Sequence, residues 1–254
     1  MQQTILTIKK NDRLTRDVMK MVLAGEGLEK HRPGQFINIK LDGMFLRRPI
    51  SVNDYEPGRV TILYKIIGKG TTAMSQMMPG QKLDVLTGLG NGFDPADAGD
   101  APLLIGGGIG TAPLYYLARV LCAEGKDVTV ILGFNNQPEI FYEEEFKKLG
   151  CKVLVSTADG SYGVKGFVTD AAKTLEAEAG APAPWSYAYV CGPEPMLKAI
   201  YPMLPKAQLS FEERMGCGFG ACMGCSCKTI TGYKRICKDG PVMRREEILW
   251  EEHK

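Results

Sequence analysis

Short apolar stretches separated by turn dipeptides run through the first part of the chain, up to about residue 98. The apolar stretches are Thr4–Ile8, Met21–Leu23, Phe36–Ile39 and Val60–Ile66, and the turn pairs are Pro33-Gly34, Pro57-Gly58 and Pro79-Gly80. Stretches of this length between such turns are typical of β-strands. The pattern predicts a small antiparallel β-barrel over residues 1–98.

From Leu103 onward, buried-strand patterns alternate with helical patterns. We expect strands at Leu103–Ile105, Val128–Leu132, Val153–Ser156 and Tyr187–Cys191, and helices at Thr111–Ala123, Tyr142–Leu149, Val168–Glu178 and Glu194–Met203. This alternation predicts an α/β domain over residues 99–206, with a parallel sheet covered by helices. A stretch rich in Gly, Asp, Pro and Ala, from Gly90 to Pro102, is the candidate linker between the two domains.

The last part of the chain, residues 207–254, is rich in glycine and cysteine and shows no helical periodicity. A segment this small needs a covalent or metal staple to fold. We therefore expect a third, small domain that is organised around its cysteines.

Composition narrows the function classes. Hydrophobic residues make up 44% and charged residues 24% of the 254 residues, which is an ordinary globular balance. The net charge of +2 gives no reason to expect nucleic acid or an anionic membrane as a partner. No apolar run approaches the roughly 20 residues that span a bilayer, and the N-terminal sequence lacks the apolar core of a signal peptide. These features predict a soluble, cytoplasmic protein.

Five of the eight cysteines fall in one short stretch. Four of them, Cys217, Cys222, Cys225 and Cys237, have the spacing C-x4-C-x2-C followed by a distant cysteine, which is typical of plant-ferredoxin-type [2Fe–2S] ligands. The glycines within this stretch allow the loop to wrap tightly and bring its amides close to sulfur. The spacing predicts a [2Fe–2S] cluster.

The alternatives are a structural zinc site and free buried thiols. Zinc ligands usually come as two short Cys-x2–4-Cys pairs, whereas this stretch has one such pair and a wider arc. Cys227 would share a face with Cys225 in an extended chain, so geometry alone does not exclude it as a ligand. Because the ferredoxin-type spacing is complete without it, we interpret Cys227 as a packing residue.

A glycine-rich turn follows the first predicted parallel strand, at Gly107, Gly108, Ile109, Gly110 and Thr111. A turn of this kind before a helix brings backbone amides to a pyrophosphate. As a G-x-G-x-x-G fingerprint it is imperfect, because Thr111 replaces the third glycine, and a generic tight turn remains an alternative. A second Gly/Pro-rich strand end, Cys191, Gly192 and Pro193, fits a cofactor lying across the same sheet edge.

The barrel half carries two weaker signals. Arg47, Arg48, Pro49, Ile50 and Ser51 combine a cation for a phosphate with a hydroxyl group, although an Arg-Pro pair is also common at surface strand ends. Gly70 and Thr71 can open a short helix and offer amides to a pyrophosphate.

In this order, the Arg-Pro-x-Ser segment, the Gly-Gly-Gly-x-Gly turn and the Cys-Gly-Pro-x-x-Met strand end resemble the ferredoxin-reductase family. With the cysteine loop added, the chain resembles, over essentially its full length, the electron-transfer subunits of class 1B dihydroorotate dehydrogenases. The most specific stretches are 156–166, STADGSYGVKG, and 212–225, EERMGCGFGACMGC.

The resemblance implies a cofactor set and site residues. It places FAD against Arg48, Pro49, Ile50, Ser51, Leu63, Tyr64, Lys65, Gly70 and Thr71. It places NAD(H), as co-substrate, against 107–111 and 191–193, and the cluster on Cys217, Cys222, Cys225 and Cys237. It also implies an FMN-containing partner subunit that oxidises dihydroorotate to orotate in pyrimidine biosynthesis, and a heterotetramer with two copies of each chain.

Such a subunit needs no general acid or base, because a flavin takes hydride from NADH and passes electrons on singly. The two histidines, His31 and His253, are accordingly expected on the surface. The region after Val155 has no arginine for a 2′-phosphate, which favours NAD over NADP, although Lys165 leaves the question open. The rival functions are a flavin subunit of a hydrogenase, sulfide dehydrogenase or bifurcating transhydrogenase, and a zinc-stapled binding module.

Overall fold

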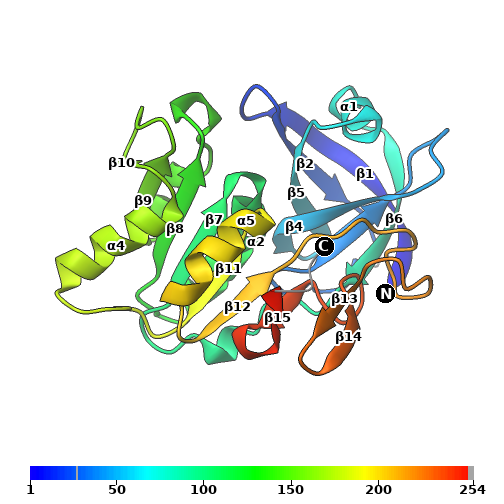
Figure 1. Ribbon diagram of the computed structural model, residues 1–254. Helices are drawn as coiled ribbons and strands as arrows, with labels where there is room; N and C mark the ends of the chain where they lie inside the picture. Colours follow the sequence, from blue (N-terminus) through cyan, green and yellow to red (C-terminus); the bar gives the residue numbers. More distant parts are fainter. Residues whose placement is uncertain (27, 251–254) are drawn as a thin grey trace.

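The computed structural model describes residues 1–26 and 28–250 of the chain. It contains a closed barrel, a seven-stranded sheet covered by helices, and a two-stranded hairpin rich in cysteine. In Figure 1 the barrel (blue to cyan) and the sheet (green to yellow) lie side by side, and the hairpin (orange) lies below the barrel. His253 lies outside the described residues.

The barrel follows from period-two alternation of apolar residues. Its strands are β1 (Gln2–Arg13), β2 (Val18–Ala24), β3 (Phe36–Ile39), β4 (Arg48–Glu56), β5 (Arg59–Lys65) and β6 (Lys82–Leu89), in the order β1-β2-β5-β4-β3-β6. Every neighbouring pair is antiparallel. Inward residues such as Ile8, Ile37 and Ile62 are fully buried. One short helix, α1 (Lys69–Ser75), joins β5 to β6.

The second sheet has the strand order β10-β9-β8-β7-β11-β12-β15. Its strands are β7 (Leu103–Gly107), β8 (Thr129–Phe134), β9 (Lys152–Thr157), β10 (Val164–Lys165), β11 (Ala188–Cys191), β12 (Ala207–Ser210) and β15 (Val242–Arg244). All pairs are parallel except β12 with β15. Every residue of β7 is buried, as expected for a central strand with both faces covered.

Helices cover both faces of this sheet. Residues of α2 (Ala112–Ala123) and α3 (Glu143–Lys148) pack into one apolar cluster, and residues of α4 (Val168–Ala179) and α5 (Glu194–Ile200) into another. Short 3₁₀ turns complete the connections, at Pro95–Asp97, Gly108–Thr111, Gln137–Glu139, Tyr201–Met203 and Arg245–Glu247. No helix in the described part of the chain is long and apolar enough to cross a membrane.

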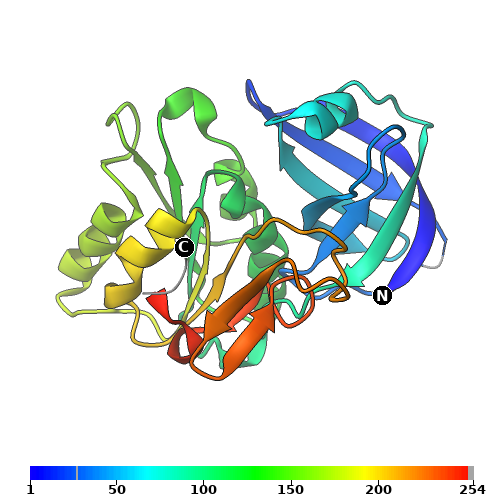
Figure 2. The same cartoon turned by 45° about the vertical axis from the view of Figure 1, so that its right-hand side comes forward.

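The cysteine-rich segment is inserted between two strands of the large sheet. β13 (Ser226–Thr229) and β14 (Gly232–Arg235) form an antiparallel hairpin between β12 and β15 in the sequence. Figure 2 shows this hairpin in front of the junction between the barrel and the sheet. The expected domain boundary at Ala207 coincides with the start of β12, which pairs with β11 and so belongs to the sheet.

The structure confirms the barrel and the α/β domain, and it corrects two local expectations. The pattern beyond Ile200 is a 3₁₀ turn, so the last predicted helix is shorter than Glu194–Met203. His31 is not a surface residue: it is 1% exposed and stacks on Tyr55 at a ring distance of 5.6 Å. Its ring contacts Tyr55 of β4 and the Gly88 amide of β6, which are distant in the sequence, so local sequence does not reveal its burial.

Candidate cofactor sites

The four predicted cluster cysteines come together as two pairs. Cys217 and Cys222 are one pair, since the Cys222 amide donates to the Cys217 sulfur and the Cys217 amide to the Cys222 sulfur, each at 3.5 Å. Cys225 and Cys237 are the other, since the Cys237 amide donates to the Cys225 sulfur at 3.4 Å. Two irons bridged by sulfide each need two thiolates, so two adjacent pairs are a donor set for a [2Fe–2S] cluster.

Backbone amides stabilise the thiolate form of Cys217, which belongs to the first pair. Burial opposes ionisation of Cys217, but the amides of Phe219, Ala221 and Cys222 together lower its pKa to about 6. The Ala221 amide lies 3.2 Å from the sulfur. Positive φ angles of 78° at Gly218 and 91° at Gly220 allow the loop to turn its amides inward. Amides that donate hydrogen bonds to the ligand sulfurs tune the properties of such clusters.

Cys227 lies apart from these pairs. It is 5% exposed, belongs to the apolar core, and its thiol donates to the Lys234 carbonyl at 3.6 Å. Burial raises its pKa to about 11, so it is a neutral thiol near pH 7. This environment supports its interpretation as a packing residue.

The two thiol pairs match the ligand requirement of a two-iron cluster. Each iron of a [2Fe–2S] cluster takes two thiolates, and each pair supplies two thiols.

The two neighbouring arginines of the barrel have different roles. Arg47 forms an ion pair with Asp84 at 3.0 Å and also donates to the Asp84 carbonyl. Arg48 has no carboxylate partner among the described residues; its guanidinium bonds the Leu46 carbonyl and the Met44 sulfur. It lies against Gly70 at the start of α1, where a β-carbon would come within 2.1 Å of its Nε. Within the described residues, a carboxylate therefore neutralises Arg47 but not Arg48.

The side chains of three other predicted flavin residues are engaged in contacts within the protein. The Thr71 hydroxyl accepts from the Ile67 and Gly68 amides, so it caps α1 and leaves only main-chain groups for a ligand. Tyr64 lies in the barrel core, where its hydroxyl donates to Asn11 at 2.9 Å and burial raises its pKa to about 12. Leu63 packs toward the α/β domain.

The remaining flavin candidates stay at the surface of the barrel. Lys65 pairs with Asp17 at 3.1 Å. Pro49, Ile50 and Ser51 are half-buried on β4. Of these, Ser51 offers a hydroxyl group and main-chain groups for a ligand.

On the nicotinamide side, the two predicted loops touch each other at the carboxyl edge of the sheet. A β-carbon at Gly110 would lie 2.3 Å from the Cys191 carbonyl oxygen, and one at Gly107 would lie 2.3 Å from the Met196 sulfur. Thr111 is fully buried and its hydroxyl has no partner. β7 and β11 are neighbours in the sheet, which brings 107–111 and 191–193 together as predicted.

Cys191 is the thiol at this edge. Burial raises the pKa of the Cys191 thiol to about 12. Ser210, which pairs with Cys191 from the neighbouring strand β12, offers a hydrogen bond that opposes this shift. At neutral pH it is therefore a protonated thiol that can donate a hydrogen bond but not act as a nucleophile.

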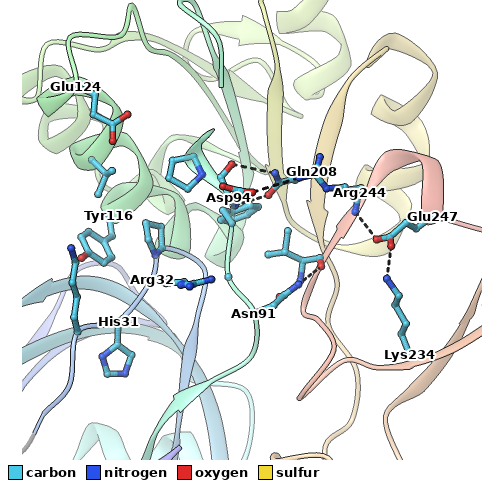
Figure 3. A pocket seen from close by; sticks show the side chains of 17 residues that line it. His31, Arg32, Asn91, Asp94, Tyr116, Glu124, Gln208, Lys234, Arg244 and Glu247 are labelled. Carbon is cyan, nitrogen blue, oxygen red and sulfur yellow. Dashed lines mark hydrogen bonds and ion pairs between the residues drawn. The ribbon is translucent and has the colours of Figure 1, made fainter. Parts of the chain in front are cut away.

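A separate cavity lies at the opposite edge of the sheet. It has a volume of about 810 Å³ and is lined by residues of the barrel, the linker, α2 and the C-terminal segment. Figure 3 shows Asp94, Gln208 and Arg244 gathered on one wall. Arg244 pairs with Asp97 at 2.7 Å, and Gln208 donates to the same carboxylate at 2.8 Å. None of the predicted cofactor residues lines this cavity.

Residues that tie the domains together were not evident from the sequence. The Asn53 side chain donates to the Ala112 carbonyl and accepts from the Tyr142 hydroxyl, both at 2.8 Å. Arg119 of α2 pairs with Asp54 of β4 at 2.7 Å. These contacts join residues 59 to 89 positions apart, so no local pattern signals them.

Comparison with known proteins agrees with this geometry. The family model described as the iron-sulfur cluster binding domain of dihydroorotate dehydrogenase B matches residues 212–249, and an oxidoreductase NAD-binding domain matches residues 104–201. The chain is 44% identical to a dihydroorotate dehydrogenase B (NAD(+)) electron transfer subunit of Shouchella clausii, covering 98% of both chains. The protein of the same name from Fusobacterium nucleatum is 44% identical over 95% of this chain and 96% of its own.

This chain belongs to the family of dihydroorotate dehydrogenase B electron transfer subunits. Among solved structures, a chain of an NADH-dependent reduced ferredoxin-NADP oxidoreductase, studied for flavin-based electron bifurcation, is 30% identical with a TM-score of 0.86. It is matched over 98% of this chain and 91% of its own. A ferredoxin NADP+ reductase from Neisseria gonorrhoeae, with 17% identity and a TM-score of 0.69 over 81% and 92% of the two chains, shares the fold.

Proposed function

We propose that this protein moves electrons between NAD(H), FAD and a [2Fe–2S] cluster as the electron transfer subunit of an NAD-linked dihydroorotate dehydrogenase. The observation that carries the proposal is the pairing of Cys217 with Cys222 and of Cys225 with Cys237 on a loop beside the barrel. Full-length identity of 44% to relatives with this name supports it.

Each cofactor has residues suited to hold it. The four cysteines hold the cluster, and loop amides stabilise their thiolates. Arg48 and the main chain at Gly70 and Thr71 would hold the flavin pyrophosphate, and Ser51 would offer its hydroxyl group to the flavin. The loops 107–111 and 191–193 bind the nicotinamide nucleotide at the carboxyl edge of the sheet.

The cofactors supply the redox chemistry: FAD exchanges hydride with NAD(H) and single electrons with the cluster. The chain's own residues bind and orient these groups. No proton needs to be moved by a side chain, which fits a buried, neutral His31 and a protonated Cys191. NAD rather than NADP is the co-substrate, because the loop after β9 carries Asp159 and no arginine.

The partner is an FMN-containing catalytic subunit that oxidises dihydroorotate to orotate in pyrimidine biosynthesis, assembled as two copies of each chain. Exposed apolar side chains beside the cluster support a protein contact there. Phe219 and Met223, on the ligand loop itself, are 41% and 53% exposed. Apolar exposure of this kind on a metal-binding loop is typical of an interaction surface.

The test is the cofactor content of the anaerobically purified chain, with an EPR spectrum after dithionite reduction. The proposal expects iron, acid-labile sulfide, flavin and an S = 1/2 signal. Cys222→Ser should lose the cluster and keep FAD, whereas the matched variant Cys227→Ser should keep both. Zinc in place of iron, or full iron and sulfide in Cys222→Ser, would refute the ligand assignment.

A flavin subunit of a bifurcating enzyme is the less favoured alternative, because identity to a chain of that class is 30%, against 44% to dihydroorotate dehydrogenase B subunits. The two functions differ in their partner. With its FMN subunit the protein should reduce NAD with dihydroorotate, while the chain alone should reduce artificial dyes with NADH only. Dihydroorotate turnover by the isolated chain would contradict the partner assignment.

A further inference from the structure

Asn38 occupies an unusual position on β3. The strand alternates, so its neighbours Ile37 and Ile39 fill the barrel core while Phe36 and Asn38 face outward. Asn38 is nevertheless 1% exposed, because the cysteine loop covers it. Its Nδ2 donates to the Cys217 carbonyl at 3.3 Å, across 179 positions of the chain.

The cysteine loop is fitted closely around this side chain. A β-carbon at Gly218 would lie 2.2 Å from Asn38 Nδ2, so only glycine allows the approach. Within the part of the chain that the structure describes, this is the one hydrogen bond from a barrel side chain to the loop 212–225. Asn38 therefore contacts both the first cluster ligand and the residue after it.

On its other side, Asn38 is the direct cross-strand partner of Pro49, and Phe36 is the partner of Ser51. Residues opposite each other in an antiparallel pair share a face, with β-carbons about 5 Å apart. Asn38 is thus placed between the β4 residues assigned to the flavin and the Cys217 main chain.

Stability alone does not account for an asparagine here. Its Oδ1 is buried without a partner, and an unsatisfied buried acceptor costs about 1–3 kcal/mol. An apolar side chain of the same shape would avoid this cost and still fill the space. The feature that such a residue would lose is the bond to Cys217.

We propose that Asn38 is a positioning residue that fixes the Cys217 end of the cluster loop against the flavin-bearing face of β3 and β4. This inference rests on the proposed function. The hydrogen bond and the close fit at Gly218 hold the main chain of the first ligand, and hence its thiolate, at a set place beside the barrel.

The test is Asn38→Leu, which keeps the branched shape in a somewhat larger side chain and removes both the donor and the orphan acceptor. Asn91→Leu is the matched control. The Asn91 side chain also links the barrel half to the C-terminal segment, since it donates to the Val242 carbonyl at 2.7 Å and accepts from the Val242 amide at 3.1 Å. These bonds do not involve the cysteines. For both variants we would measure iron and flavin content, the EPR g-values of the reduced cluster, and stopped-flow reduction of flavin and cluster by NADH.

Asn38→Leu should keep iron, FAD and the rate of flavin reduction. It should shift the EPR g-values and slow the appearance of reduced cluster by on the order of tenfold, because a small displacement of a reacting group has large rate effects. Asn91→Leu should match the unmodified protein in each of these readouts. Asn38→Ser, which removes the same bond with a smaller side chain, gives the same test if the leucine variant does not accumulate.

Unaltered g-values and an unaltered cluster reduction rate in Asn38→Leu would overturn the positioning role and leave the proposed function intact. Equal changes in Asn38→Leu and Asn91→Leu would also overturn it, because they would reflect general docking of the C-terminal segment. Absence of iron and sulfide from the unmodified protein would overturn the proposed function and this role with it.

Discussion

Single side chains in this protein acquire their chemistry from neighbours that are distant in the sequence. The thiols of Cys122 and Cys151 lie 3.5 Å apart, where the end of α2 meets the start of β9. A hydrogen bond from Cys151 lowers the pKa of the Cys122 thiol, although burial opposes the shift. Cys122 is half-buried, so reagents can reach it, whereas Cys151 is buried.

Cys122 should therefore be the most readily alkylated cysteine outside the cluster. Its thiolate fraction at neutral pH is raised by the hydrogen bond, and the thiolate is the reactive form. Peptide mass spectrometry after brief treatment with iodoacetamide would measure the rate. In Cys151→Ala the rate at Cys122 should fall; an equal or faster rate would show that Cys151 does not lower the pKa.

Burial of His31 makes the stability of the folded protein depend on pH. Burial lowers its pKa below the ordinary 6.5, while the nearby Glu29 opposes the shift. Its Nδ1 lies 3.1 Å from the Glu29 carbonyl, and its Nε2 faces the Gly88 amide at 3.4 Å, an arrangement that suits the neutral ring.

As the pH falls below about 6.5, the unfolded chain takes up a proton that the folded chain excludes. The free energy of unfolding should then fall, by at most about 1.4 kcal/mol per pH unit, until the folded pKa is passed. Thermal unfolding at neutral pH and at about pH 5.5 would show a drop in Tm. The drop should be smaller in His31→Gln, and an identical drop would remove His31 as its source.

At the scale of elements, two loops at the carboxyl edge of the sheet form one surface because glycines let them touch. Gly110, in the 3₁₀ turn that leads into α2, packs against the main chain of Cys191 and Gly192 at the end of β11. Backbone atoms cannot move aside as a flexible side chain can, so any β-carbon there must separate the loops.

Gly110→Ala should slow flavin reduction by NADH, by on the order of a hundredfold, and leave FAD and iron content unchanged. Stopped-flow absorbance with NADH would measure the rate. Gly125→Ala, at the other end of α2, is the control: it has a positive φ of 76° but no atom within 4 Å of the added methyl group. An unchanged rate in Gly110→Ala would remove this contact from the nicotinamide site.

At the scale of the whole molecule, the barrel and the α/β domain are joined by buried polar contacts. Asn53 is fully buried and bonds Ala112 and Tyr142, both in the α/β domain. Burial raises the pKa of Tyr142 well above its usual range, so its hydroxyl stays protonated and donates to Asn53. The arrangement fixes how the barrel and the α/β domain face each other.

Tyr142→Phe should lower the free energy of unfolding by about 1–3 kcal/mol, because it leaves the Asn53 oxygen buried without its donor. Tyr162→Phe is the matched change, since the Tyr162 hydroxyl donates to Glu143 at an exposed site. Thermal or urea unfolding followed by circular dichroism would compare the two. Equal stability of both variants would show that the Asn53 contact does not hold the domains together.

The local sequence pattern was sufficient to predict the bounds of a strand or helix where that element is regular. β3 was predicted with its observed ends, Phe36–Ile39, and α2 to within one residue. It was insufficient for β4 and β6, which carry many polar residues and were not singled out as strands. Their apolar residues become core only when the barrel closes.

The sequence by itself determined the cofactor chemistry of this protein, because the spacing of four cysteines and the glycine-rich strand ends are short-range properties of the chain. Tertiary structure decided which of two adjacent arginines pairs with a carboxylate, and that His31 is buried. It also decided that Asn38 meets Cys217. These outcomes depend on partners tens to hundreds of positions away, which only the closed barrel and the docked cysteine loop bring into contact.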